Sequence, residues 1–220
     1  MKRILTALAV VAMAAAIPTI GSAASTDCST LAQPFTGTVN GGLTVSDSDS
    51  CTLEGATIHG DIDQTGGTLQ MDNSTIDGGI DMSDGSLLVC GSRINGRIDA
   101  TGGSSVVVGA VEQPEDGFPF SGPCNCNRIN GNTDVSGITG LVEFDSNTIN
   151  GGLDLINNGI PTATEVEVEA NDIQGQLNCV GNASVTDDGQ VNGVTAGPAS
   201  CPPLSKVKEV PGCTTLSGAS

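Results

Sequence analysis

The sequence predicts an all-β fold, a single-stranded parallel β-helix (β-solenoid) with coils of about 18 residues and disulfide-stapled caps. Three observations predict it. A short phrase, apolar-x-Gly, recurs along the chain; apolar and polar residues alternate on either side of it; and no 3.6-residue helical period appears after the first 24 residues. Because each unit is too short to bury its own apolar face, successive units must stack.

The first 24 residues have the composition of a secretory signal peptide. Lys2 and Arg3 precede an apolar run, and small residues follow it, so we predict cleavage near Ala23 or Ala24. No later stretch is long and apolar enough to predict a transmembrane segment in the mature chain. We therefore expect a secreted, extracellular or periplasmic protein.

The mature chain is strongly acidic. Loss of Lys2 and Arg3 leaves five basic residues against 25 acidic ones, a net charge of about −20. This charge repels nucleic acid and anionic lipid, so we expect no nucleic-acid partner. It favours solubility, and it attracts cations or basic partners.

The cap predicted before the solenoid covers residues 25–37, and the solenoid itself covers residues 38–195. Spacings between copies of the phrase run from 18 to 24 residues, except for one of 35, which we interpret as two units of which one has lost the pattern. We interpret the glycine as leaving room in a narrow interior. The eight copies begin at Val39, Ile58, Ile76, Ile94, Ile129, Ile149, Ile173 and Val191.

Units such as Ile94-Asn-Gly-Arg-Ile-Asp99 resemble the coils of secreted parallel β-helix repeat proteins. In rhythm they are also similar to the bactofilins, whose β-helical cores polymerise end to end without nucleotide. The resemblance covers about residues 38–195 and implies a stacked β-helical core. Export and a high cysteine content distinguish this chain from the bactofilins.

Two loops interrupt the rhythm, and a further cap follows the solenoid. The loop insertions span 109–127 and 156–165, and we interpret the larger as a lid pinned by a disulfide or as a recognition loop. Residues 196–220 form the predicted C-terminal cap or tail. Caps are expected because the open edge of a solenoid would otherwise stack on other molecules.

Cysteines are even in number, which in an exported chain predicts disulfides. Zinc is the alternative for Cys124-Asn-Cys126, but the C-x-C spacing does not match the usual C-x-x-C pair. We expect Cys28 to pair with Cys51, Cys90 to pair with Cys124 or Cys126, and some pairing to occur among Cys179, Cys201 and Cys213. The eight are Cys28, Cys51, Cys90, Cys124, Cys126, Cys179, Cys201 and Cys213.

A line of carboxylates is the candidate site. Five aspartates each lie five positions after the lead residue of a unit, so stacking places them about 4.8 Å apart. Two interpretations remain open: solvated carboxylates, or weak Ca²⁺ sites, since calcium prefers oxygen ligands. The line consists of Asp63, Asp81, Asp99, Asp134 and Asp154.

A second line, one position after each lead residue, is rich in amides and is expected to stack them or to face water. His59 stands in this position and is interpreted as a surface variant, not a catalytic base. The basic residues Arg93, Arg97 and Arg128 either line one patch or offset nearby aspartates. The amide-rich line consists of Asn40, Asp77, Asn95, Asn130 and Asn150.

These features predict a non-catalytic, secreted or cell-surface structural and adhesion module. Its expected partner is an extracellular polysaccharide or cell-surface component, and Ca²⁺ is the only cofactor considered. The alternative is a small polysaccharide-active enzyme, a lyase or glycosidase, because many parallel β-helices resemble such enzymes. Any two neighbouring ladder carboxylates meet the spacing of a retaining glycosidase, so that spacing does not discriminate between the two functions. With one histidine and no Trp or Tyr, the chain has no Ser/His/Asp arrangement and lacks the usual stacking platforms for sugars.

Overall fold

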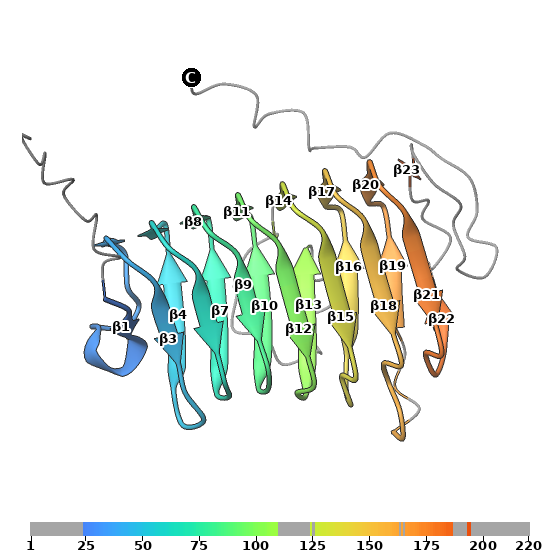
Figure 1. Ribbon diagram of the computed structural model, residues 1–220, viewed down its shortest axis with the longest axis horizontal. Helices are drawn as coiled ribbons and strands as arrows, with labels where there is room; N and C mark the ends of the chain where they lie inside the picture. Colours follow the sequence, from blue (N-terminus) through green and yellow to red (C-terminus); the bar gives the residue numbers. More distant parts are fainter. Residues whose placement is uncertain are drawn as a thin grey trace, which may run out of the picture.

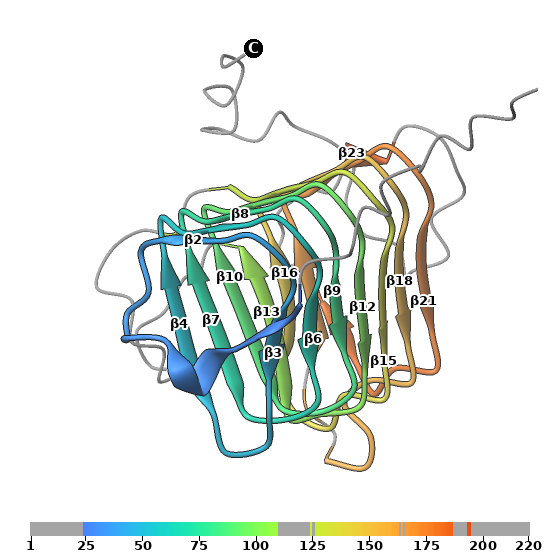
Figure 2. The ribbon, with the colours of Figure 1, turned by 60° about the vertical axis from the view of Figure 1, so that its left-hand side comes forward.

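In the computed structural model the chain winds into a β-solenoid with three long faces, each a parallel sheet (Figures 1 and 2). The structure describes residues 24–109, 124, 126–162, 164, 166–186 and 193–194. Each coil contributes one strand to each sheet, which confirms the fold class predicted from the repeat. The predicted C-terminal cap, with Cys201 and Cys213, and nearly all of the predicted signal peptide lie outside the described residues.

Sheet A contains eight strands in sequential order. They are β1 (Thr26–Asp27), β3 (Leu43–Val45), β6 (Ile62–Gln64), β9 (Ile80–Met82), β12 (Ile98–Thr101), β15 (Thr133–Ser136), β18 (Leu153–Ile156) and β21 (Leu177–Val180). Sheet B contains seven strands: β4 (Ser50–Glu54), β7 (Thr68–Asp72), β10 (Ser86–Cys90), β13 (Ser105–Gly109), β16 (Val142–Asp145), β19 (Val166–Glu169) and β22 (Val185–Thr186).

Sheet C contains eight short strands, each of which starts a unit of the repeat. They are β2 (Thr38–Val39), β5 (Thr57–Ile58), β8 (Thr75–Ile76), β11 (Arg93–Ile94), β14 (Arg128–Ile129), β17 (Thr148–Ile149), β20 (Asp172–Ile173) and β23 (Gly193–Val194). One short 3-10 helix, η1 (Cys28–Thr30), lies near the N-terminal end.

The core is built from columns of identical or similar side chains in strict register. In sheet A, Ile62, Ile80 and Ile98 occupy equivalent positions in β6, β9 and β12, and all three are fully buried. Burial of each such side chain contributes about 1.5–3 kcal/mol. The predicted period-two alternation is therefore correct: inward residues are apolar, and the next residue points outward.

Strand pairing corrects two details of the repeat. β11 pairs directly with β14, so the spacing of 35 residues is one coil with a long excursion after Gly109, and not two units. Arg93 pairs with Arg128 and Ile94 with Ile129, so the two units are neighbours in sheet C despite their separation in sequence. In the last coil Ile173 pairs with Val194, so Val194 and not Val191 is its lead residue.

The glycine of the repeated phrase is required for a different reason from the one predicted. A Cβ atom on Gly78 would lie 2.7 Å from the carbonyl carbon of Gly60, and one on Gly96 would lie 2.6 Å from that of Gly78. Equivalent glycines thus stack backbone against backbone, and the space is needed against the preceding coil, not in the interior. This glycine column is Gly41, Gly60, Gly78, Gly96, Gly131, Gly151 and Gly175.

The corner between sheets B and C holds a line of buried polar side chains, here named the buried ladder. The backbone N–H of Ser92 donates to Asn127 Oδ1 (2.7 Å), and Asn127 Nδ2 donates to Asn147 Oδ1 (3.0 Å). Each asparagine amide also donates to a main-chain carbonyl of the preceding coil, so the corner is satisfied without water. The ladder consists of Ser74, Ser92, Asn127, Asn147 and Asn171, all at most 2% exposed.

Disulfides fasten the N-terminal end and the long excursion. Cys28 bonds to Cys51, as predicted, and Cys90 bonds to Cys124, which selects one of the two expected partners. Cys126 and Cys179 are disulfide-bonded as well. The segment predicted as an N-terminal cap lies on the first coil by main-chain pairing: Thr26 pairs with Leu43, and Phe35 forms a bridge with Leu53.

Candidate functional site

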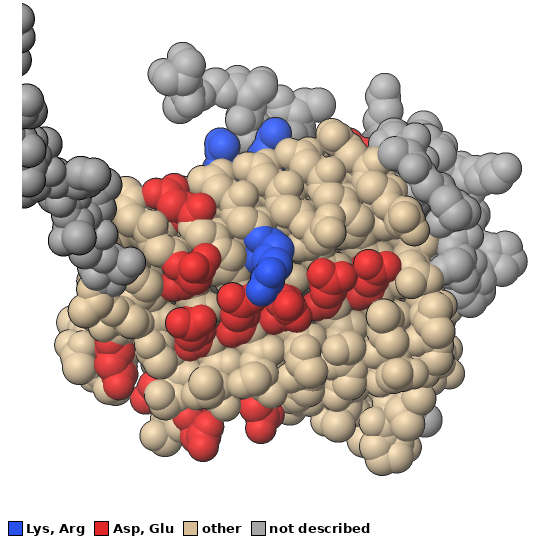
Figure 3. Space-filling view, viewed as in Figure 1, with Lys and Arg blue, Asp and Glu red and all other residues tan. Residues whose placement is uncertain are grey.

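The five aspartates of the predicted line lie together on the outer face of sheet A. Strand register pairs Asp63 with Asp81, Asp81 with Asp99, Asp99 with Asp134, and Asp134 with Asp154. Figure 3 shows acidic side chains running as a continuous line across this face. We name this set the acidic ladder. Its geometry was predictable because each aspartate follows an inward apolar residue and must point outward.

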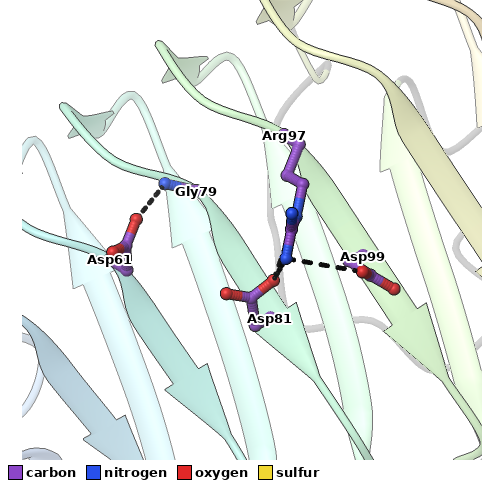
Figure 4. A network of polar contacts seen from close by, with 5 residues as sticks. All are labelled: Asp61, Gly79, Asp81, Arg97 and Asp99. Carbon is purple, nitrogen blue, oxygen red and sulfur yellow. Dashed lines mark hydrogen bonds and ion pairs between the residues drawn. The ribbon is translucent and has the colours of Figure 1, made fainter.

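Arg97 lies over the middle of the acidic ladder (Figure 4). Its Nη2 atom is 2.9 Å from Asp81 Oδ1 and 3.6 Å from Asp99 Oδ2. The pKa of Arg97 is raised, first by the hydrogen bond to Asp81 and then by the charges of Asp81 and Asp99. This single positive charge is therefore shared between two of the five carboxylates, although its exposure keeps the free-energy gain small.

The other end of the acidic ladder contains a hydrogen-bonded carboxyl pair. The pKa of Asp134 is raised by partial burial first, then by its hydrogen bond to Asp154 and by the charges of Asp154 and Asp99; Arg97 opposes the shift. Two adjacent carboxylates cannot both ionise without cost, which is why the neighbouring charge of Asp154 raises the pKa of Asp134. Asp134 and Asp154 differ in this from the Arg97-paired carboxylates.

A shallow groove of about 500 Å³ runs over the outer face of β6, β9 and β12. Carboxylates line it together with hydroxyl groups two residues further along the chain, at or just after the end of each strand, and Arg97 lies beside them. A groove of this kind offers hydrogen-bond donors and acceptors in a repeating pattern and has no aromatic wall. Its lining includes Asp63, Asp81, Asp99, Thr65, Ser83 and Thr101.

Among the described residues no group of three or more His, Cys, Asp or Glu side chains is placed to hold a metal ion. Calcium binding along the acidic ladder stays a prediction. Melting of the mature protein in millimolar Ca²⁺ and in chelator tests it, and an unchanged melting temperature would remove it.

The amide-rich line is found on the outer surface beside sheet C, and its side chains hydrogen-bond from coil to coil. His59 Nδ1 is 2.6 Å from Asp77 Oδ2, and Asn95 Nδ2 donates to Asp77 Oδ1 at 3.2 Å. Asn130 donates to Asn95 and Asn150 donates to Asn130, at 3.0 and 2.7 Å. We name His59, Asp77, Asn95, Asn130 and Asn150 the exposed ladder; stacking of amides here is confirmed.

His59 is a member of this ladder, with a side chain 47% exposed. Its hydrogen bond is the largest cause of the lowered pKa of Asp77, with the hydrogen bond from Asn95 and the charges of His59 and Arg93 adding to it. His59 thus links two coils, in agreement with its interpretation as a surface variant.

The three arginines separate, so each of the two open interpretations holds for part of the set. Arg97 offsets aspartates on sheet A, whereas Arg93 and Arg128 are paired in register on sheet C.

Sequence reasoning missed the buried ladder. Its signal was present, because Ser or Asn lies two positions before the lead residue in five consecutive units, as in Ser74-Thr-Ile76 and Asn147-Thr-Ile149. The pattern was overlooked because such residues are equally typical of exposed turns.

Comparisons with known proteins add no relative. No protein-family model matches the chain, and no curated protein or solved structure matches it either. Within the part of the chain that the structure describes, no helix could cross a membrane.

Proposed function

We propose that this protein is a non-catalytic structural and adhesion module, exported from the cell, whose long faces contact an extracellular polysaccharide or another cell-surface component. The observation that carries the proposal is the use made of its polar outer side chains. In the exposed ladder, and in the ion pair between Arg97 and Asp81, these side chains bond one coil to the next. Side chains used in this way support a rigid, repetitive surface.

Disulfides support an exported role. Bonds such as Cys28–Cys51 and Cys90–Cys124 are typical of proteins that fold in oxidising compartments. The groove on sheet A supports contact with a hydroxyl-rich polymer, because carboxylate and hydroxyl groups repeat along it once per coil. The similarity in rhythm to bactofilins adds only the solenoid architecture, and we propose no filament-forming role from it.

A second function, polysaccharide cleavage, is favoured by one observation. Asp134 and Asp154 form a hydrogen-bonded carboxyl pair in which the pKa of Asp134 is raised. A glycosidase needs one carboxyl that keeps its proton and one that is ionised. The raised pKa of Asp134 favours the first of these two roles, and its register partner Asp154 is the neighbouring carboxyl, so cleavage by this pair is the alternative to be tested.

The test combines binding and cleavage. Mature protein is incubated with a panel of uronate and neutral polysaccharides, and both its retention and the appearance of new reducing or unsaturated ends are measured. Retention without new ends is the expected result. New ends would contradict the non-catalytic proposal.

Variants then separate the two functions. If ends appear, the double variant Asp134→Asn, Asp154→Asn should abolish them, whereas Asp63→Asn, a ladder carboxylate outside the pair, should leave them unchanged. If the pair variant cleaves as well as the wild type, the carboxyl pair is not the source of activity.

A further inference from the structure

Arg93 and Arg128 lie side by side on sheet C, and neither forms an ion pair within 4.0 Å among the described residues. β11 and β14 are adjacent, and Arg93 is directly opposite Arg128 in their register. Ion pairs within 4.0 Å among the described residues involve Arg97 and His59, not these two arginines. Figure 3 shows basic side chains at the upper edge of the molecule, apart from the acidic line.

Both guanidinium groups are held in place by the exposed ladder. Arg93 Nε donates to Asn95 Oδ1 at 2.8 Å, and Arg128 Nε donates to Asn130 Oδ1 at 3.2 Å. Asn130 Nδ2 in turn donates to Asn95 Oδ1, so the two anchors are linked. Since a guanidinium has five N–H donors, each arginine keeps the four on its Nη atoms for another group.

The pairing of the two arginines carries a cost that Asp77 offsets only in part, through the charge interaction with Arg93, and that a further anion would relieve. Like charges directly opposite each other on neighbouring strands, about 4.8 Å apart, are destabilising. The positions on either side in the same row are the uncharged Thr75 and Thr148. Asp77 is a nearby carboxylate, but its oxygens accept hydrogen bonds from His59 and Asn95.

We propose that Arg93 and Arg128 form a binding site for an oxyanion group, a sulfate ester or a carboxylate, carried on an extracellular polysaccharide. The planar fork of arginine matches such groups, and anchored Nε atoms lower the cost of ordering them. Hydroxyl groups of Thr75 and Thr148 extend the row with donors and acceptors for sugar hydroxyls.

The acidic character of the whole chain does not cancel this site. The acidic ladder belongs to sheet A, a different face, and a Debye length of about 8 Å at physiological ionic strength screens charges at that range. A sparsely charged glycan is favoured over a dense polyanion, which the net charge of −18 would repel. The proposal rests on the proposed adhesive function and names its ligand class.

The first experiment uses the mature protein and inorganic sulfate. Arginine Nε–Hε signals are followed by NMR while sodium sulfate is added, against sodium chloride at equal ionic strength. Signals of Arg93 and Arg128 should shift with sulfate and not with chloride, and those of Arg97 should shift with neither. Equal responses of all three arginines would overturn the site.

The second experiment uses three dextrans with the same backbone: unmodified, lightly sulfated and lightly carboxymethylated. Calorimetry should show that an anionic dextran binds and the unmodified one does not, and the tighter of the two identifies the group. Arg93→Gln should weaken binding by about tenfold. Arg97→Gln, which removes the same charge from sheet A, should leave the affinity within about twofold of the wild type.

Failure of the site and failure of adhesion have different signatures. Equal weakening by Arg93→Gln and Arg97→Gln would indicate a net-charge effect and overturn the site. Polysaccharide retention that survives the Arg93→Gln, Arg128→Gln double variant would overturn the site and keep adhesion. Selective sulfate shifts without retention of any polysaccharide would keep an oxyanion site, overturn its assignment to a glycan and contradict adhesion.

Discussion

The buried ladder and the exposed ladder are two lines of polar side chains that run in parallel along the same solenoid, only three positions apart in each unit. Both contain asparagines at coil spacing, and both pass hydrogen bonds from one coil to the next. They differ in what else they bond. Asn147 in the buried ladder also donates to the Val108 carbonyl at 2.7 Å, whereas the side-chain amide of Asn150 in the exposed ladder donates to another side chain, Asn130 Oδ1, at 2.7 Å.

Burial, not residue type or spacing, decides how much each ladder contributes to stability. In the buried ladder a lost amide leaves main-chain and side-chain groups that water cannot reach, and each such group costs about 1–3 kcal/mol. The exposed ladder is only partly buried, so water can reach its groups and replace most of a lost bond. The buried ladder therefore contributes more to the stability of the fold.

The largest expected effect comes from replacing one member of each ladder. Asn147→Ala should lower the free energy of unfolding by about 3 kcal/mol, because it removes the partners of the Val108 carbonyl and of one Asn127 N–H. Asn150→Ala is the matched control and should cost less than about 0.5 kcal/mol. Urea unfolding measures both. Equal losses of unfolding free energy in the two variants would contradict the difference between the buried and the exposed ladder.

The glycine column provides the next effect, at two neighbouring residues. A Cβ atom on Gly151 would lie 2.6 Å from the backbone N of Asn132, while one on Gly152 would come no closer than 3.2 Å to its nearest neighbour, Gln176 O. Gly151→Ala should therefore cost about 2 kcal/mol. Gly152→Ala should cost about half as much or less. A reversed order, again from urea unfolding, would show that coil-to-coil backbone contact is not limiting.

Thr133 is a buried polar residue outside both ladders, so its hydroxyl lacks the partners that a ladder supplies. It is fully buried in the sheet A column, and its Oγ1 has no hydrogen-bond partner in the described structure. Thr133→Val keeps the shape and removes the orphaned hydroxyl, so it should raise stability by about 1 kcal/mol. Thermal unfolding measures the gain. A lower melting temperature would mean that the hydroxyl is satisfied.

The smallest effect is the pH dependence of the acidic ladder. The pKa of Asp134 is raised above its ordinary value of 3.8 by partial burial and by Asp154. Its folded form therefore holds a proton more tightly than the unfolded chain does. The resulting stabilisation is complete below about pH 3.8 and is lost as the pH rises through the folded-state pKa.

Melting temperatures of wild type and Asp134→Asn, measured from pH 3 to pH 7, isolate this contribution. The wild type should lose stability relative to the variant as the pH rises. A difference that stays constant, or that changes in the opposite direction, contradicts the raised pKa of Asp134.

Much of the fold was predictable from the sequence because a solenoid repeats one local pattern. Alternation of period two placed Ile80 inward and Asp81 outward, and the common spacing aligned the five aspartates. The pattern could not say which coil follows Ile94, since a long excursion and a missing unit give the same spacing. Strand pairing with Ile129 resolved it.

The interaction partner of a side chain was harder to predict than whether that side chain points inward or outward. Arg93 and Arg97 are four residues apart, yet one anchors to Asn95 on sheet C and the other reaches Asp81 on sheet A. A turn of the coil separates them, and sequence spacing does not give its direction. The reason for the glycine column was predicted wrongly for a related reason. Each glycine is needed against the backbone of the preceding coil, and the residue types in a sequence do not show where that backbone lies.

The most direct test of a non-catalytic adhesion module is one assay on the mature protein, in which retention on polysaccharides and the formation of new chain ends are measured in the same samples. We expect retention on at least one polysaccharide with no new reducing or unsaturated ends over the incubation. New ends that disappear in the Asp134→Asn, Asp154→Asn double variant would contradict it and identify an enzyme.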